Sequence, residues 1–521
     1  MTQNEALEIL KLGYNVFLTG PAGSGKTFVL NKFIKYLKAN NIEVAVTAST
    51  GIAATHLNGT TIHSWSGLGI SEGLDKKELK KIVKKRKLRN RILRTITLII
   101  DEMSMLGAAQ LDAVDKICRA IRENDLPFGG IQTVFCGDFF QLPPVKRTGK
   151  GENHFAYASD VWREMDIKVC YLDEQHRQKD TSLTRILNDI RKNSVSEETI
   201  RIVESCKGVI FGNYKPAKLF THNADVDRIN FLELGRISEK PYAYNMQSDG
   251  KEKYVEFLKK SCLAHERLVL KKGAQVMFVR NSFEEGYVNG TMGKIAGFSE
   301  DRKFPIVKTF SGREIIASPA TWVFEEDGVE LAKIKQIPLR LAWAITVHKS
   351  QGMSLDAAEI DLSKTFEYGM GYVAISRVRT LEGLRVIGTN KMAFEVCRNS
   401  LEIDLEFINQ SAGALKEFYK MSEKERDEKK DKFLEENRIT DKEATGKACS
   451  YAESEEKREK SYSLEEIREK FPKAYMPWTE EEDRELEEIF LGGKSAKEMA
   501  KIFQRKRDAI SSRLKKLGLI E

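Results

Sequence analysis

The sequence predicts an α/β protein with two parallel-sheet units, a small antiparallel β insertion and three helices at its C-terminal end. Short apolar, β-rich runs alternate with helical stretches up to about residue 175, and a similar alternation returns between about 217 and 388. Inside the second unit, residues 267–330 contain short strand-like runs divided by Gly and Asn-Gly turns, which is typical of a small antiparallel barrel.

Four parts are therefore expected along the chain. They are a first α/β domain over 1–175 with a small insertion at about 66–95, a second over 176–410 with the barrel at about 267–330, a charged linker over 411–465, and a helical domain over 466–521.

Composition indicates an ordinary folded protein. The 521 residues are 41% hydrophobic and 31% charged, and the net charge of +8 is small beside 85 basic and 77 acidic residues, so the distribution of charge matters more than its total. Seven dispersed cysteines without a Cys-x-x-Cys pair indicate reduced thiols and no zinc site. No signal-peptide h-region or membrane-length apolar run is present, so a cytoplasmic location without membrane contact is expected.

The stretch "GPAGSGKT" follows an apolar strand and precedes a helix, which is the context that a phosphate-binding loop requires. Glycines let backbone N–H groups face the phosphates, and the helix N-terminus adds partial positive charge. Lys26 is expected to reach the β- and γ-phosphates of ATP, and Thr27 to offer its hydroxyl to Mg²⁺. The expected nucleotide-binding residues are Gly20, Pro21, Ala22, Gly23, Ser24, Gly25, Lys26 and Thr27.

Two further strand ends carry candidate catalytic groups. "LIIDE" brings Asp101 and Glu102 to the carboxyl edge of the sheet, where Asp101 would hold Mg²⁺ and Glu102 would deprotonate the attacking water. "FCGDFFQLPP" adds Gln141, which could hydrogen-bond the γ-phosphate or the water, although a buried glutamine capping a turn is the alternative. The Asp101–Glu102 pair is informative only in combination with Lys26. Together the three residues predict hydrolysis of the nucleotide.

These stretches, with "TASTGIAATHLNGTTIHSW", "EQHRQ", "AITVHKSQGMSLD" and "YVAISRVRTLEGL", resemble the Pif family of superfamily 1B DNA helicases over about residues 1–388. The resemblance implies two RecA-like domains that hold ATP and Mg²⁺ between them, a wedge at the first insertion and a Src-homology-like barrel at the second. It also implies that Gln3 reads adenine and that Arg177 and Arg377 reach the γ-phosphate, where a guanidinium can neutralise developing charge.

The same resemblance places DNA contacts in both domains. The implied residues are Thr50, Thr61, His63 and Ser64 in the first domain, and His348, Lys349 and Ser350 in the second. Hydroxyls and a lysine suit sequence-independent phosphate binding. Trp65 could stack on a base or lie in the core. The basic run 76–94 could contact duplex at a fork or be a solvated helix with one apolar side.

An ATP-dependent 5′–3′ DNA helicase acting on single-stranded DNA and on forked or tailed duplex is the expected function, with G-quadruplex or RNA–DNA hybrid as further targets. The protein is expected to act as a monomer. A bacterial or phage origin is expected because little precedes Gln3. The alternatives are an ATPase that remodels protein–DNA complexes, a RecD-type helicase, and a DNA-binding regulator with a vestigial ATPase fold.

The C-terminal segment predicts a three-helix module. Thr479 with Glu482 and Ser495 with Glu498 have the capping-box spacing, and the third helix begins near Arg507. Apolar residues repeat at helical spacing, and Arg507 and Arg513 are expected to face outward. The pattern resembles a Myb-like helix-turn-helix module that contacts duplex DNA, and the alternative is a protein-docking domain.

Overall fold

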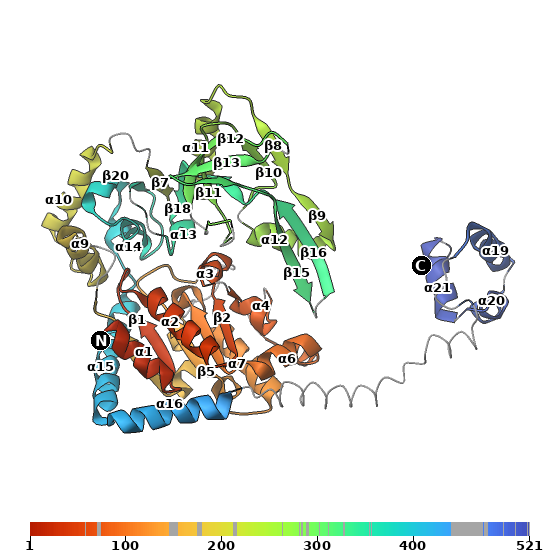
Figure 1. The fold of residues 1–521 in the computed structure, drawn as a ribbon, viewed down its shortest axis with the longest axis horizontal. Coiled ribbons are helices and arrows are strands. Elements are labelled where there is room, and N and C mark those ends of the chain that lie inside the picture. The colour runs from red at the N-terminus through yellow and green to blue at the C-terminus, as the bar shows by residue number, and fades with distance from the viewer. Residues whose placement is uncertain are drawn as a thin grey trace. The chain divides into compact units, whose positions relative to one another are not determined.

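The computed structural model describes most of the chain (Figure 1). The described residues are 1–57, 59–69, 74–144, 155–174, 180–211, 216–262, 264–280, 282, 285–287, 291–301, 303–310, 312–326, 329–353, 355, 357–438, 473, 478–492, 494–505, 507–517 and 519. They form two compact units, 1–438 and 439–521, which are described separately.

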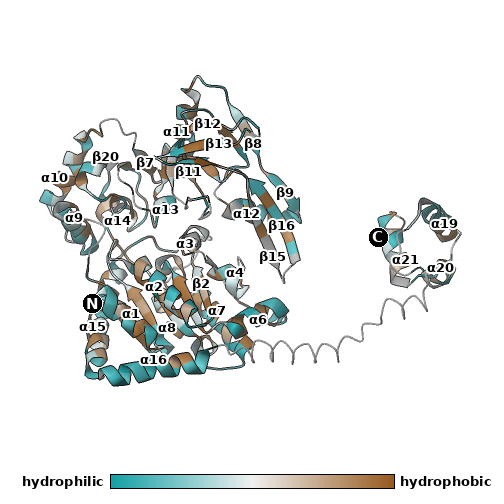
Figure 2. Cartoon of the chain, viewed as in Figure 1, coloured by the Kyte–Doolittle hydropathy of each residue, from teal (hydrophilic) through white to brown (hydrophobic). Residues whose placement is uncertain are grey.

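A six-stranded parallel sheet organises the first half of unit 1. Its order is β3-β2-β4-β5-β1-β6. The bounds are β1 Asn15–Thr19, β2 Val44–Ala48, β3 Thr60–Thr61, β4 Thr97–Asp101, β5 Gln132–Cys136 and β6 Ile167–Tyr171. The sheet is covered on both faces, because Phe17 belongs to one core cluster and its neighbours Val16 and Leu18 to another. Figure 2 shows the resulting hydrophobic strands inside more polar helices.

Helices flank this sheet. Their bounds are α1 Gln3–Lys11, α2 Lys26–Ala39, α3 Gly51–His56, α4 Ile62–Ser66, α5 Lys76–Val83, α6 Arg86–Arg94, α7 Ala108–Arg122 and α8 Asp160–Glu164. The helices α1, α4, α5 and α8 begin at residues whose side chains cap them. Thr2 and Glu5 form a capping box at α1, and Asp75 and Glu78 form one at α5. The pair α5–α6 is the predicted insertion, and its buried residues Ile82, Leu88 and Ile92 leave most of its lysines and arginines exposed.

The second half of unit 1 contains a four-stranded parallel sheet of order β18-β7-β19-β20. The bounds are β7 Ala217–Phe220, β18 Ala344–Thr346, β19 Ala358–Leu362 and β20 Leu384–Thr389. Its helices are α9 Thr181–Arg191, α10 Glu197–Ser205, α11 Asn223–Gly235, α13 Val347–Ser350 and α14 Met370–Ile375. Together the two sheets confirm the predicted alternation of apolar strands and helices.

The antiparallel insertion between β7 and β18 is larger than the sequence predicts. Its elements are β8 Tyr242–Asn245, β9 Gln247–Gly250, α12 Glu252–Ser261, β10 Arg267–Leu270, β11 Gln275–Phe278, β12 Met292–Phe298, β13 Pro305–Thr309, β14 Glu314–Ile316, β15 Ala320–Glu326, β16 Val329–Gln336 and β17 Leu339–Leu341. They pair as β14-β13-β12-β11-β17, β15-β16-β9 and β10-β8. The early strands escaped prediction because β9 is entirely exposed and polar.

The expected linker must be corrected at its start. Residues 411–438 belong to unit 1, as the end of α15 Arg398–Lys420 and as α16 Glu423–Asn437. Phe407 and Phe418 are buried in cores of the first half, and Lys430 pairs with Glu8 at 2.7 Å. Phe433 packs so closely on Gly13 that a Cβ there would lie 2.6 Å from the ring. The packing of this segment was not predicted, because its few apolar residues stand among many charged ones.

Unit 2 contains α19 Glu480–Leu491, α20 Ala496–Ile502 and α21 Arg507–Lys516. Both predicted capping boxes are present, at Thr479 and at Ser495. A small core holds every apolar residue that the helical spacing selected. The buried members are Leu486, Met499, Ala500, Phe503, Ile510 and Leu514, and Ile489, Phe490 and Leu517 pack against them.

Candidate nucleotide and DNA site

The phosphate-binding loop joins β1 to α2 at the carboxyl edge of the first sheet. Gly20, Gly23 and Gly25 take left-handed φ values of 138°, 91° and 90°, which residues with a Cβ rarely adopt. The Lys26 ammonium donates to the carbonyl oxygens of Gly20 at 2.7 Å and Pro21 at 3.0 Å. Burial lowers the pKa of Lys26, and the nearby Asp138 carboxylate opposes that shift. Thr27 is exposed at the start of α2.

Gln3 lies directly beside this loop. Its side-chain amide donates to the carbonyl oxygen of Ser24 at 3.1 Å, and its backbone N–H donates to Glu174 at 3.1 Å. The contact with the loop is close, because a Cβ on Gly25 would lie 2.1 Å from the Gln3 amide nitrogen. The first turn of α1 therefore brings a donor and acceptor to the edge of the expected nucleotide position.

The acidic pair stands at the end of β4. Glu102 takes a left-handed conformation (φ 55°, ψ 49°), its N–H donates to Asp101 Oδ1 at 2.8 Å, and its carbonyl accepts from the Ser49 hydroxyl at 2.8 Å. Burial raises the pKa of Asp101. Burial and the Asp101 charge raise the pKa of Glu102 to about 7, which suits a general base working near neutral pH.

Gln351 connects the two halves of unit 1 at this point. Its side-chain amide donates to Glu102 Oε2 at 2.9 Å and to Gln141 Oε1 at 3.2 Å. Gln141 itself is buried. The sequence had suggested Gln141 but not Gln351, although Gln351 directly follows three expected DNA-contact residues. This glutamine brings the segment after β18 into contact with the expected base.

Arg377 is buried just after α14 and bonds within its own half. Its guanidinium donates to the carbonyl oxygens of Val373 at 2.8 Å, Met353 at 3.3 Å and Ser350 at 3.4 Å. Its charge also lowers the pKa of Glu102 against the larger effect of burial, which places it near the acidic pair. The other expected arginine, Arg177, lies outside the described residues.

A buried polar network lies between the phosphate-binding loop and the second half. The Tyr372 hydroxyl accepts from the Ala22 N–H at 2.9 Å and donates to Asp138 Oδ2 at 3.2 Å. Arg191 pairs with Asp138 at 2.6 Å and with Asp404 of α15 at 3.0 Å. Arg191, Asp138 and Tyr372 join both halves around Ala22. Asp138 and Tyr372 lie within stretches that indicate the family, but no role had been predicted for any of the three residues.

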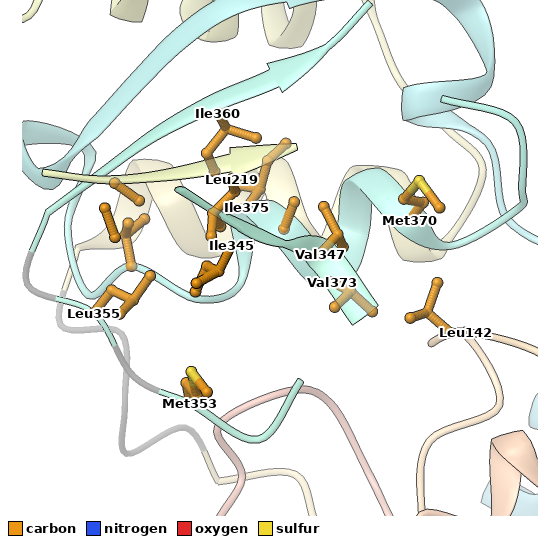
Figure 3. Packing of buried hydrophobic residues seen from close by; sticks show 14 of the residues in the cluster. Leu142, Leu219, Ile345, Val347, Met353, Leu355, Ile360, Met370, Val373 and Ile375 are labelled. Carbon is orange, nitrogen blue, oxygen red and sulfur yellow. The ribbon is translucent and has the colours of Figure 1, made fainter. Parts of the chain in front are cut away.

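Hydrophobic packing continues this junction. Phe140 and Leu142, which follow β5, belong to the same core cluster as the residues of α14. Figure 3 shows Leu142 facing Met370 and Val373 across the boundary between the two halves. The loop that carries Gln141 is therefore held between buried contacts to the second half.

The expected DNA residues of the first half lie around α3 and α4. Thr50 accepts from the Ala53 N–H at 3.2 Å, and Thr61 caps α4 by accepting from the Ser64 N–H at 3.2 Å. Ser64 is exposed and His63 is half-buried. Trp65 is 3% exposed and lies within the core. The interpretation as a core residue is therefore confirmed, and the alternative that it stacks on a base is wrong.

Of the three DNA-contact residues expected in the second half, His348 and Lys349 are partly exposed and Ser350 is buried. His348 lies 3.5 Å from Glu367, and the Lys349 ammonium donates to Asn223 at 3.3 Å. Ser350 is fully buried and its hydroxyl donates to the carbonyl oxygen of Val347, so the predicted Ser350 hydroxyl contact with DNA does not fit. An exposed aromatic ring that the sequence reasoning missed, Phe366, lies against His222 with centroids 4.9 Å apart.

In unit 2, Arg513 bonds to Asp483 and lies over the Trp478 ring, with its guanidinium 5.7 Å from the centroid. This arginine therefore serves the packing of the module, which does not fit its expected outward position. The structure describes the backbone of Arg507 at the start of α21 but not its side chain.

Among the described residues, no His, Cys, Asp or Glu cluster could hold a metal ion by itself. Mg²⁺ bound with a nucleotide is commonly held by one or two side chains and the substrate phosphates. Thr27 and Asp101 fit that arrangement. No described helix is long and apolar enough to cross a membrane.

Comparisons with known proteins agree on one family. A sequence profile described as PIF1-like helicase matches residues 3–198, and one described as the 2B domain of DNA helicase Pif1 matches residues 253–298. The ATP-dependent DNA helicase Pif1 of Psychrobacter sp. is 43% identical, with 83% of this chain and 75% of that protein covered. ATP-dependent DNA helicase PIF1 of Xenopus laevis is 36% identical over 74% of this chain, which spans 60% of that protein.

Solved structures give the same result. The Pif1 helicase of Candida albicans is 35% identical with a TM-score of 0.71, covering 78% of this chain and 98% of that one. The Bacteroides Pif1 helicase in complex with ADP-AlF3 and single-stranded DNA is 31% identical with a TM-score of 0.58, covering 79% and 97%. These similarities extend across both halves of unit 1.

Proposed function

Because the chain belongs to the PIF1-like family of ATP-dependent DNA helicases, we propose that it moves 5′ to 3′ along single-stranded DNA and unwinds forked or tailed duplex. The observation that carries this proposal is the Gln351 amide, which contacts both Glu102 and Gln141. It joins a candidate DNA segment of the second half to the candidate catalytic base of the first. Closure of the two halves and hydrolysis would then depend on each other.

In the proposed reaction, Glu102 removes a proton from the water that attacks the γ-phosphate. Lys26 exchanges its two carbonyl partners for phosphate oxygens, and Gln3 contacts the adenine beside the loop. Arg377 and Arg177 stabilise charge on the transferring phosphoryl group. Thr27 and Asp101 would hold Mg²⁺, which supplies charge neutralisation between the phosphates when bound.

DNA binding is proposed over the surfaces that expose hydroxyls, cations and an aromatic ring. The similar Bacteroides helicase is described with single-stranded DNA bound. In this chain, Ser64, Lys349 and Phe366 supply a hydroxyl, a cation and an exposed ring for phosphates and bases. The exposed lysines and arginines of α5–α6 suit a duplex backbone at a fork. G-quadruplexes and RNA–DNA hybrids are additional candidate substrates, and a monomer is the proposed acting form.

The single experiment that tests this function is ATP turnover with and without oligothymidylate. We expect hydrolysis to rise strongly when single-stranded DNA is added, because Gln351 links the two sites. Robust DNA-stimulated turnover without displacement of a strand from naked forked duplex would favour the alternative, an ATPase that remodels protein–DNA complexes. Turnover that ignores DNA would contradict the proposal.

Unit 2 is proposed to tether the helicase to duplex DNA. The module is a three-helix domain whose third helix, α21, exposes Ser512 and Lys516. Deletion of residues after about 461 should leave ATP turnover on single strands intact. Affinity for tailed duplex should fall and its salt dependence should flatten, because phosphate contacts are lost. Unchanged duplex affinity would favour a protein-docking role.

A further inference from the structure

A pocket of about 460 Å³ lies in the second half of unit 1, where β17 and α13 meet the segment from α12 to β10. Its basic and acidic lining residues, with one histidine, are Lys259, His265, Glu266, Arg267, Arg340 and Lys349. Four of the six are Lys or Arg and one is an acid, and Glu266 is itself paired with Lys259 at 3.0 Å. The pocket therefore carries an excess of positive charge.

Arg340 is the unusual member of this pocket. It is 1% exposed, yet its Nε has no hydrogen-bond partner, and no carboxylate pairs with its guanidinium among the described residues. The Nε of buried Arg191 also has no hydrogen-bond partner, but that guanidinium has two ion pairs, and buried Arg377 bonds to backbone carbonyls. A buried charge without a partner is costly, so such groups are usually paired or bind a ligand.

Lys349 shares the pocket and is affected by the same charge. Burial and the neighbouring Arg340 lower the pKa of Lys349 to about 8, and Asp227 of α11 opposes the shift. Burial and Arg340 also lower the pKa of His265, which favours its neutral form. Two cations on β17 and α13 thus face one pocket. The Asp227 carboxylate is near enough to raise the pKa of both, but among the described residues it forms an ion pair with neither. An anionic ligand would relieve the burial cost of both.

We propose that this pocket binds one backbone phosphate of single-stranded DNA, with Arg340 and Lys349 as its ligands. The planar fork of an arginine matches two phosphate oxygens, and the lysine adds a point charge. Exposed Arg267 at the pocket would meet a neighbouring phosphate of the same strand. The proposal rests on the DNA-translocating function, and it adds Arg340, which no motif in the sequence indicated.

The test compares wild type with Arg340→Met and with the matched control Lys335→Met, an exposed lysine on β16 of the same insertion. Oligothymidylate affinity is measured over a salt series. We expect Arg340→Met to bind about tenfold more weakly at low salt and to reduce the slope of log affinity against log salt by about 0.7, the loss of one phosphate contact. Lys335→Met should match wild type in both.

Thermal stability separates a ligand site from a structural role. Arg340→Met should melt no lower than wild type, because it removes an unpaired buried charge.

A second measurement, proton uptake on DNA binding, uses wild type alone and does not depend on the variant. At pH 8, calorimetry in buffers of different ionisation enthalpy should show uptake of up to about half a proton on binding oligothymidylate, as Lys349 becomes fully charged.

Three results would overturn the proposal. They are an unchanged affinity and salt slope for Arg340→Met, no proton uptake by wild type at pH 8, and Arg340-dependent stabilisation by inorganic phosphate alone without any effect of Arg340 on DNA binding. If wild type failed to bind oligothymidylate at all, the proposed function itself would be wrong, and the two failures are therefore distinguishable.

Discussion

Replacing Gln351 with leucine should shift the pH dependence of hydrolysis in a calculable way. The Gln351 amide donates to the Glu102 carboxylate at 2.9 Å and so favours its charged form. A hydrogen bond to a charged group contributes about 1.5–3 kcal/mol, which corresponds to about one to two pH units. With Glu102 titrating at about 7, loss of the donor should move the acid limb up to roughly pH 8–9.

The predicted rate follows from the fraction of deprotonated Glu102. At pH 7 that fraction falls from about one half to roughly 1–10%, so kcat/KM for ATP with saturating oligothymidylate should fall about 5- to 50-fold. The loss should shrink as the pH rises toward 9. The assay is a pH profile of kcat/KM, which reports the free enzyme, with the exposed Gln410→Leu as control. A pH-independent loss would refute the reasoning.

Three further variants test the nucleotide site and the buried network around Arg191. Lys26→Ala should weaken ATP binding, whereas Glu102→Gln should bind ATP and DNA but turn over on the order of 100- to 1,000-fold more slowly, as titration and single-turnover assays would show; near-normal turnover by Glu102→Gln would exclude it as the base. Arg191→Met should lower the free energy of unfolding by about 3–5 kcal/mol in urea titrations, because Asp138 and Asp404 lose their buried partner. The exposed Arg201→Met is its control, and equal stability of the two variants would exclude a structural role for the network.

Local patterns predicted most of the fold. The central strands β1, β4 and β5 of the first sheet are almost entirely buried, so they appear in the sequence as apolar runs bounded by turns. The phosphate-binding loop carries its glycines and Lys26 within eight consecutive residues. The helices of unit 2 could be placed because Thr479 and Ser495 mark their starts with capping boxes.

Contacts between distant segments could not be predicted in the same way. Gln351 meets Glu102 across 249 positions of sequence, and Arg191 joins Asp138 to Asp404 across both halves of unit 1. Gln351 and Asp138 lie within stretches that indicate the family, but no local pattern shows which distant side chain each one contacts. The docking of α16 on unit 1 was missed for a related reason. Its segment was expected to be a linker, because Phe433 and Leu434 form only a short apolar face inside a run of charges.

The central claim is that this chain couples ATP hydrolysis to directed movement on DNA, and strand displacement with defined tails tests it most directly. A duplex with a 5′ single-stranded tail, one with a 3′ tail and one with blunt ends are each mixed with protein, ATP and Mg²⁺. The proposed 5′–3′ movement predicts displacement of the 5′-tailed duplex alone, with none by the Glu102→Gln variant. Preferential unwinding of the 3′-tailed duplex, or displacement that persists without hydrolysis, would contradict it.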